Sequence, residues 1–234
     1  MNLTDINQIE YKKQLTYFYK YYGSEFRKGQ GTEYILNMIK KFSNEGTLID
    51  FGSGSNIYFW LIAFNQINYA LCVDISKEAF CINEYIRKKI LYPKSCKFGL
   101  KKYKKNFDDI IKIKVNYKVY DILNKPFLKN IKYDNVTQFG LLGLCKSKRE
   151  YLTNLNKLLQ LLNCNGVFLG ANWCFSKKYS KKLGYNNSYL TKKLIIDYAK
   201  KNNYCILHLQ IIPIKNDINY TYVLIYALRK KYDF

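Results

Sequence analysis

The chain has 234 residues, of which 48% are hydrophobic and 24% are charged, a composition that fits one globular domain and excludes a disordered chain. No apolar run approaches the roughly 18 residues needed to cross a bilayer, and residues 1–10 lack the apolar stretch and the basic lead of a signal peptide. We therefore expect a cytoplasmic protein with no membrane partner.

The net charge of +22 comes mostly from lysine, since Lys and Arg together number 39 and only four of them are Arg. Proteins that read nucleic acids favour arginine for its planar fork. The lysines are spread along the whole chain, as in A/T-rich coding sequences. The charge alone is compatible with a nucleic-acid or anionic-lipid partner, but its distribution favours a basic, well-solvated surface. The seven cysteines include no C-x-x-C pair, and the one histidine, His208, lies in an apolar stretch, so we expect neither a metal site nor a disulfide framework.

Hydrophobic spacing predicts two helices in the N-terminal region, near residues 9–22 and 32–42, with a break at Gly23-Ser24. Strands and helices then alternate. Strands are expected at 47–50, 69–74, 117–121, 133–139 and 167–171, and helices through 60–64 and at 77–89, 150–162 and 190–201. Residues 94–114 predict a loop or an exposed helix. Two apolar strands, 206–214 and 220–228, are joined by a short polar loop and predict an antiparallel hairpin.

This order predicts the fold class. Alternating strands and helices imply parallel βαβ units with right-handed crossovers, and the terminal hairpin adds an antiparallel strand. We predict an α/β protein with a Rossmann-like, doubly wound, seven-stranded sheet. The expected organisation is a single domain, with a helical N-terminal cap over 1–46 and a ligand-binding core over 47–234.

The chemistry is expected at Asp50-Phe51-Gly52-Ser53-Gly54, the turn between the first strand and its helix. Ligands of open parallel sheets bind beyond the carboxyl ends of the strands, and glycine there lets the backbone approach them. The dinucleotide fingerprint needs a third glycine where this chain has Ile57, so no pyrophosphate cradle is expected.

Two further acids close the next two predicted strands. Asp74 lies about 20 residues beyond the glycines, where an acid accepts hydrogen bonds from ribose hydroxyls. Asp121 closes the third strand, one strand further along the same edge, and is placed to read an adenine. The set describes a nucleoside site without phosphates, for which S-adenosylmethionine (SAM) is the common ligand.

At these residues the chain resembles a known family of class I SAM-dependent methyltransferases. Residues 50–58 are similar to the first motif of the small-molecule N-methyltransferases that act on nicotinamide, phenylethanolamine, indolethylamines and thioethers. The tyrosine-rich run 17–22 resembles that family's N-terminal helix, which folds over the cofactor. Val73-Asp74-Ile75-Ser76 and Tyr120-Asp121-Ile122 resemble its ribose and adenine segments, so the likeness covers nearly the whole chain.

The resemblance implies a set of cofactor contacts and catalytic residues. The implied cofactor contacts are Asp50, Gly52, Ser53 and Gly54 in the first turn, Tyr22 and Tyr58 at the carboxylate and sulfonium end, Asp74 and Ile75 at the ribose, Asp121 and Ile122 at the adenine, and Phe139 after the fourth strand. The side chains expected nearest the reacting atoms are Tyr17, Tyr22 and Asn172. The chain departs from the family where the fifth strand ends in Asn172-Trp173 without the usual acid, which argues against aromatic-amine and nicotinamide acceptors. Ala79 also replaces an asparagine near the ribose, and Phe139, Trp173 and Phe175 are expected to form an aromatic wall.

The main functional hypothesis is methyl transfer from SAM to a small amine or thioether by in-line displacement. An alternative is a cyclase that consumes SAM alone and forms azetidine-2-carboxylate and methylthioadenosine. An RNA-directed methyltransferase is a second alternative, although the chain has no Asp/Asn-Pro-Pro-aromatic segment and no Pro-Cys pair. A catalytically silent methyltransferase fold is the last.

Overall fold

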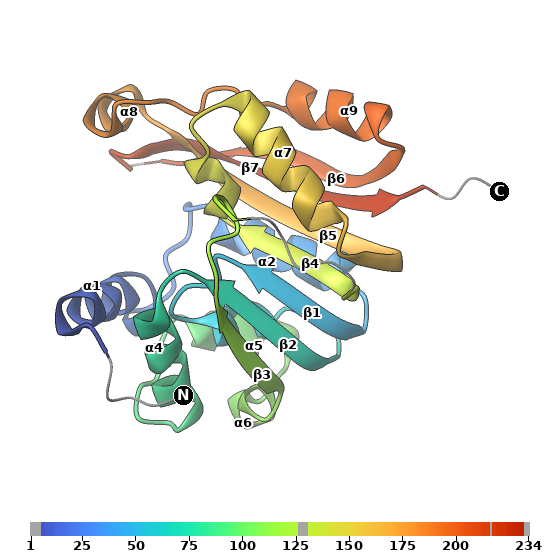
Figure 1. Cartoon of the computed structure of the whole chain (residues 1–234). Helices are drawn as coiled ribbons and strands as arrows, with labels where there is room; N and C mark the ends of the chain where they lie inside the picture. The colour runs from blue at the N-terminus through green and yellow to red at the C-terminus, as the bar shows by residue number, and fades with distance from the viewer. Residues whose placement is uncertain (1–5, 126–130, 216, 232–234) are drawn as a thin grey trace.

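A seven-stranded sheet forms the centre of the computed structural model, which describes residues 6–125, 131–215 and 217–231 (Figure 1). The strands are β1 (Gly46–Phe51), β2 (Ile67–Asp74), β3 (Lys114–Val119), β4 (Tyr133–Phe139), β5 (Leu162–Phe175), β6 (Tyr204–Pro213) and β7 (Tyr220–Lys230). Their order is β3-β2-β1-β4-β5-β7-β6. The pairs from β3 to β5 are parallel, and β7 runs antiparallel to both of its neighbours. The predicted Rossmann-like sheet with an antiparallel C-terminal hairpin is confirmed.

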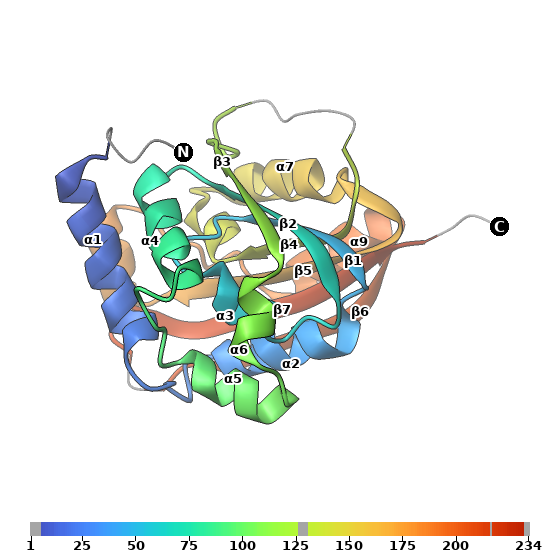
Figure 2. The same ribbon diagram turned by 90° about the horizontal axis from the view of Figure 1, so that it is seen from below.

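Helices cover both faces of this sheet (Figure 2). They are α1 (Gln8–Phe18), the π-helical turn η2 (Tyr19–Gly23), α2 (Thr32–Phe42), α3 (Ile57–Leu61), α4 (Lys77–Arg87), α5 (Cys96–Tyr103), α6 (Phe107–Ile111), the 3-10 turn η3 (Leu141–Leu144), α7 (Lys148–Leu159), α8 (Lys177–Leu183) and α9 (Lys192–Lys201). The weakly patterned stretch 94–114 contains α5 and α6, and α8 was not expected from the sequence.

Two apolar layers fill the space between the helices and the sheet. One layer, here called the α2–α6 face, contains Leu48 of β1 together with Leu36 of α2. The other, the α7/α9 face, contains Ile49 of β1 together with Leu155 of α7. Because side chains alternate along a strand, Asp50 points to the α2–α6 face.

Three strands differ clearly from their predicted bounds, β3 at the edge where the parallel strands end and β5 and β7 at the opposite edge. β3 ends at Val119, so Asp121 lies two residues beyond it. β5 begins at Leu162, ahead of the predicted start at 167, and passes through Asn165-Gly166. Asn165 has a φ of 64°, and the register of β5 with β4 shifts there, so the irregularity is absorbed within the strand. β7 extends to Lys230, beyond the predicted end of the hairpin.

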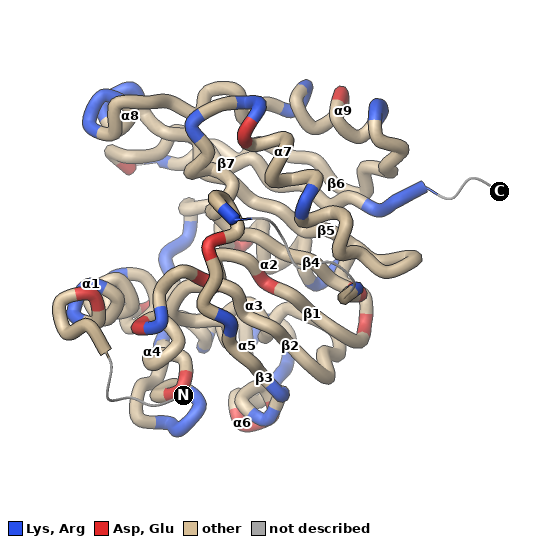
Figure 3. Tube along the Cα trace, viewed as in Figure 1, with Lys and Arg blue, Asp and Glu red and all other residues tan. Residues whose placement is uncertain are grey.

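Basic side chains are distributed over most elements, and α8 carries four exposed lysines (Figure 3). His208 lies on β6 with its ring centroid 5.6 Å from that of Phe42, and burial together with the charge of Lys41 lowers its pKa. Among the residues that the structure describes, none of the helices is both long and apolar enough to span a membrane.

Candidate functional site at the carboxyl ends of the strands

The glycine-rich turn after β1 is tied to β2 and leaves open space above it. The Gly52 and Ser53 amides donate to the carbonyl oxygen of Val73, at 2.8 and 3.4 Å. Gly52 and Gly54 have φ angles of +66° and +58°, in the left-handed region that favours glycine. A Cβ on Gly52 would lie 2.9 Å from Leu141, whereas a Cβ on Gly54 would meet nothing within 4 Å. The turn can therefore accept a ligand over Gly54.

Asp74 is held by the backbone at the end of β2. One carboxylate oxygen accepts the Gly54 amide and the other accepts the Ser76 amide, both at 2.9 Å. Burial raises the pKa of Asp74, although these two hydrogen bonds oppose the rise. The Ile75 amide also bonds to this carboxylate, but a carboxylate has roughly four lone-pair sites, so the side chain can still accept a hydrogen bond from a ligand.

Asp50 lies beside Asp74 and is 2% exposed. The Thr137 hydroxyl of β4 donates to it at 2.5 Å. Burial raises the pKa of Asp50 to about 7, with a further rise from the charge of Asp74, and the Thr137 hydrogen bond opposes both. Within the described ranges neither carboxylate forms an ion pair. Two neighbouring carboxylates without a cation, in a chain of net charge +22, form a site suited to a positively charged ligand.

Tyr17 and Tyr22 lie over these two carboxylates. Their ring centroids are 6.3 Å apart, and the Tyr22 ring packs on Phe59 of α3 at 5.4 Å. Residues five apart in an α-helix point about 140° from each other. The π-helical turn η2 brings such residues closer to one face, because its hydrogen bonds join positions five apart.

The hydroxyls of both tyrosines are turned inward. Tyr17 is 46% exposed, yet desolvation of its hydroxyl raises its pKa to about 12, and Asp74 contributes to that rise. Burial raises the pKa of Tyr22 far above its usual value, with Tyr17 and Asp50 among the nearby groups. Both tyrosines thus lie near Asp50 and Asp74, and their contact with a cofactor stays a prediction.

Several buried polar atoms at the turn have no good partner. In the described part of the chain, Ser53 Oγ, Ser55 Oγ and Asn56 Nδ2 are buried and form no hydrogen bond within normal geometry. The thiols of Cys72 and Cys96 lie beside Ser53 and Asn56, but sulfur is a weak partner. Most buried polar groups in folded proteins are paired. The unpaired ones here are therefore available to a polar ligand.

The expected adenine side lies at the ends of β2 and β3. Ile75 is 71% exposed there. The Asp121 carboxylate accepts the Asn124 amide and side chain, at 3.2 and 2.9 Å, and these bonds lower its pKa. Ile122, in contrast, is buried in the α7/α9 layer, so its side chain does not reach the edge.

Two predicted site residues lie away from Tyr17 and Tyr22. Tyr58 is fully buried in the α2–α6 layer, where its hydroxyl points toward that of Tyr117. Asn172 faces the opposite side of the sheet, because Trp173 and Asn172 alternate along β5, and its amide donates to the Tyr151 hydroxyl at 3.2 Å. Neither is brought together with the carboxylate pair.

Aromatic side chains do gather at the ends of β4 and β5. Phe139 is half-buried and its ring centroid lies 4.6 Å from that of Trp60. The Trp173 indole donates to the Gln30 carbonyl oxygen at 3.2 Å. Phe175 packs instead against Tyr179 of α8, with centroids 5.3 Å apart.

Sequence reasoning missed two residues that hold the site together. Thr137 pairs with Asp50 across strands that are 87 residues apart in the chain, and only the β1–β4 register shows this. Asn83 of α4 donates to the Gly54 carbonyl oxygen at 2.8 Å and accepts the Ile57 amide at 2.9 Å. An asparagine on the buried face of a predicted helix was the one available signal for Asn83.

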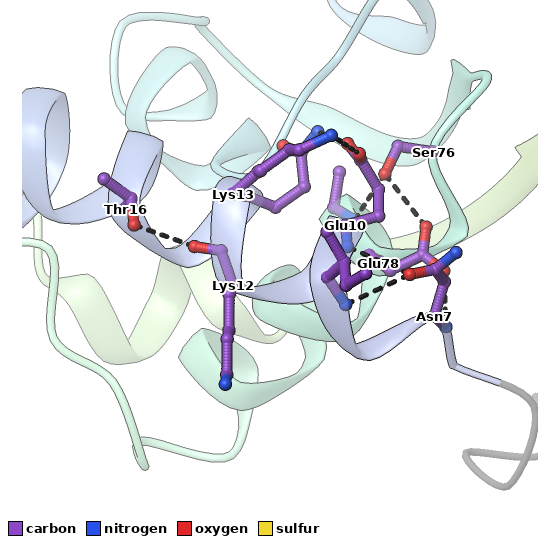
Figure 4. A network of polar contacts seen from close by, with 10 residues as sticks. Asn7, Glu10, Lys12, Lys13, Thr16, Ser76 and Glu78 are labelled. Carbon is purple, nitrogen blue, oxygen red and sulfur yellow. Dashed lines mark hydrogen bonds and ion pairs between the residues drawn. The ribbon is translucent and has the colours of Figure 1, made fainter.

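A hollow of about 550 Å³ lies outside the carboxylate site, on the exposed face of α1. Its lining residues are Ile9, Lys12, Lys13, Thr16, Tyr17, Lys20 and Tyr21. Only Tyr17 is shared with the carboxylate site. The hollow is an open depression along one helix face, several of whose residues appear in Figure 4.

Comparison with known proteins identifies the fold. No protein-family model matches the chain, and no curated protein matches it. The N-methyltransferase NodS from Bradyrhizobium japonicum WM9, in complex with S-adenosyl-L-homocysteine (SAH), is similar with a TM-score of 0.56 and 10% identity, over 97% of this chain and 90% of that chain. A SAM-dependent methyltransferase from Clostridium acetobutylicum ATCC 824 has a TM-score of 0.60 and 14% identity, over 95% and 99%. Magnesium protoporphyrin IX methyltransferase (ChlM) from Synechocystis PCC 6803, with bound SAM, has a TM-score of 0.58 and 11% identity, over 94% of this chain and 91% of that chain.

The chain therefore has the class I methyltransferase fold. At this level of identity the likeness concerns the fold alone. The finer resemblance to the nicotinamide and phenylethanolamine N-methyltransferases stays a prediction.

Proposed function

We propose that the protein is a SAM-dependent methyltransferase that acts on a small molecule with an amine nitrogen or a thioether sulfur as acceptor. The observation that carries the proposal is the carboxylate pair Asp50 and Asp74. It lies beside an open glycine-rich turn and has no cationic partner among the described residues. SAM is a nucleoside that carries a sulfonium and an ammonium group, so its charge and its polar groups match this site.

Particular residues would hold the cofactor. Asp74 would accept the ribose hydroxyls through its free lone pairs, and Asp50 would face the positively charged methionine end. Ser53 and Ser55 offer unpaired hydroxyls beside Gly54. The exposed apolar side chain of Ile75 is placed to pack against a base. We leave Tyr58, Ile122 and Asn172 out of these contacts.

The protein's share of the catalysis is alignment and the exclusion of water. SAM, when bound, supplies a methyl group that its sulfonium already activates. Tyr17 and Tyr22 would cover the reacting atoms and restrict the acceptor to a productive approach, the effect that makes well-oriented reactions fast. Their raised pKa values keep both hydroxyls protonated near neutral pH, so they donate and accept hydrogen bonds without acting as bases. A neutral amine or a thioether needs no base to attack.

The aromatic side chains beside the strand ends support a small acceptor. Phe139 and Trp173 are partly exposed aromatic side chains next to the strand ends, with Trp60 buried behind Phe139, and they suit an apolar or flat molecule. Two of the structural neighbours are described by their names as an N-methyltransferase and as an enzyme acting on magnesium protoporphyrin IX. The small RNA methyltransferase HEN1 shares the fold as well, so the support comes from the site and not from the fold.

Titration calorimetry with SAH and SAM tests the cofactor assignment. We expect binding of both by the wild-type chain, and the absence of heat at millimolar ligand would refute the proposal. Mass spectrometry of products formed from SAM, with and without a panel of amines and thioethers, then tests the reaction. Methylthioadenosine formed without any acceptor would support the cyclase in place of methyl transfer.

A further inference from the structure

A chain of hydrogen bonds leads from the glycine-rich turn to the beginning of α1. It starts with the Gly54 amide on Asp74, and Asp74 in turn accepts the Ser76 amide, both at 2.9 Å. The Ser76 hydroxyl then donates to Glu78 at 3.2 Å, as Figure 4 shows. The loop that carries the proposed ribose acid is thus bonded to a second carboxylate.

Glu78 connects this loop to α1. Its other oxygen accepts the Asn7 amide at 3.1 Å, although the two residues are 71 positions apart (Figure 4). Asn7 is the N-cap of α1, where its side-chain oxygen accepts the Ile9 and Glu10 amides at 3.0 and 3.1 Å. Glu78 therefore joins the beginning of α4 to the beginning of α1.

Glu78 is a buried carboxylate that depends on its two hydrogen bonds. Only 8% of its surface is exposed, and a carboxylate in such surroundings is costly unless its oxygens are hydrogen-bonded. Here each oxygen has one partner, and its position in the first turn of α4 is favourable to a negative charge.

The opposite end of the α1 segment carries the tyrosines that cover the site. Two separate hydrogen bonds hold the chain there. The Ser95 amide donates to the Tyr22 carbonyl oxygen at 3.1 Å, and the Trp173 indole donates to the Gln30 carbonyl oxygen. Among the described residues, Asn7–Glu78 is the one backbone hydrogen bond that joins the start of α1 to the core. The Tyr11 ring adds an edge contact with the ring of Tyr85 in α4, with centroids 6.4 Å apart. Losing this hydrogen bond leaves the beginning of α1 held to the core mainly by the side-chain packing of Tyr11 and Leu15, so that this end of the helix can move away from Asp74 more easily.

We propose that Glu78 is a positioning residue that keeps α1 closed over the bound cofactor. Because Glu78 bonds both to the Asp74–Ser76 loop and to the α1 N-cap, a ligand that orders the loop also favours the closed position of α1. The proposal rests on the function proposed above.

The test compares Glu78→Ala and Glu78→Gln with Glu10→Ala. The matched control removes the same charge from α1, where the Glu10 carboxylate, among the described residues, bonds to Lys13 and Gln14 of its own helix. We expect SAH to dissociate about tenfold faster from Glu78→Ala, the factor that the loss of one hydrogen bond to a charged group produces. The association rate should change less than twofold. Glu78→Gln, whose carbonyl can still accept the Asn7 amide, should recover part of the effect, and Glu10→Ala should dissociate like the wild type in surface plasmon resonance.

Hydrogen exchange of the α1 amides provides a readout that does not depend on ligand. In the ligand-free protein, exchange over 9–18 should be faster in Glu78→Ala than in the wild type and Glu10→Ala, and SAH should no longer slow it in Glu78→Ala. Unchanged exchange in Glu78→Ala, or unchanged SAH dissociation, would overturn the proposal. A wild-type chain that binds SAH while Glu78→Ala behaves identically refutes the role of Glu78 alone, whereas a wild-type chain that binds no SAH refutes the proposed function.

Discussion

The substitution Asp50→Asn should stabilise the ligand-free protein and weaken cofactor binding at the same time. The Asp50 pKa is 3.8 in an ordinary setting and about 7 in the folded chain, where burial disfavours the charged form. Between these two values the unfolded chain ionises Asp50 and the folded chain does not. The free energy of unfolding therefore falls as pH rises, by about 1.4 kcal/mol per pH unit, and the loss is complete above about pH 7.

The accumulated cost to the folded state is roughly 4 kcal/mol at pH 8. Asparagine carries no charge and escapes this cost, and its carbonyl can still accept the Thr137 hydroxyl. Its amide adds an unpaired buried donor, which costs about 1–3 kcal/mol. We therefore expect Asp50→Asn to be about 1–3 kcal/mol more stable than the wild type at pH 8, with no gain at pH 4.

Urea denaturation from pH 4 to 8 measures the first effect and calorimetry with SAH measures the second. SAH carries an ammonium group, so its affinity for the wild type should rise from pH 6 to pH 8 as Asp50 ionises, and Asp50→Asn should show a weaker affinity with a flatter pH profile. Parallel stability profiles for the two proteins would refute the reasoning.

Asp134→Asn is the matched control. Asp134 lies at the other end of β4 and accepts the Thr47 amide and hydroxyl and the Asn163 amide, each at 2.8 Å. Burial tends to raise its pKa, but these bonds outweigh burial and lower it. Its contribution is present above the unfolded pKa and is lost as pH falls, so Asp134→Asn should be less stable than the wild type at pH 8 and should bind SAH normally.

Four other substitutions test separate parts of the site. Asp74→Ala should weaken SAM binding by at least ~1.5 kcal/mol, because it removes acceptors for ligand hydroxyls; calorimetry that shows an unchanged affinity would contradict the ribose assignment. Tyr22→Phe should lower turnover, once an acceptor is known, more than it lowers the melting temperature, and full activity with an unchanged melting temperature would exclude a role for its hydroxyl. Gly54→Ala should cost about 1–2 kcal/mol for its positive φ alone. Gly52→Ala should cost more, because its Cβ would also lie 2.9 Å from Leu141; equal losses in urea denaturation would show that Leu141 moves aside freely.

Local signals in the sequence were enough to predict the succession of strands and helices along the chain and the position of the glycine-rich turn. The predicted bounds of α2 and β4 agree with the structure residue for residue, because apolar spacing and polar flanks act over a few neighbouring positions. The acids after the first two strands were placed for the same reason. Parallel strands bring their carboxyl ends to one edge whatever lies between them.

The tertiary structure decided everything that depends on register and on the pairing of distant segments. The Thr137 bond to Asp50 and the Glu78 bond to Asn7 join residues 87 and 71 positions apart, and no local pattern encodes such pairs. Asn172 and Trp173 are neighbours on β5, so their side chains lie on opposite faces of the sheet, because the side-chain period of a strand is two. The sequence by itself therefore determined which residues stand at the strand ends, and only the packed fold decided which of their side chains meet.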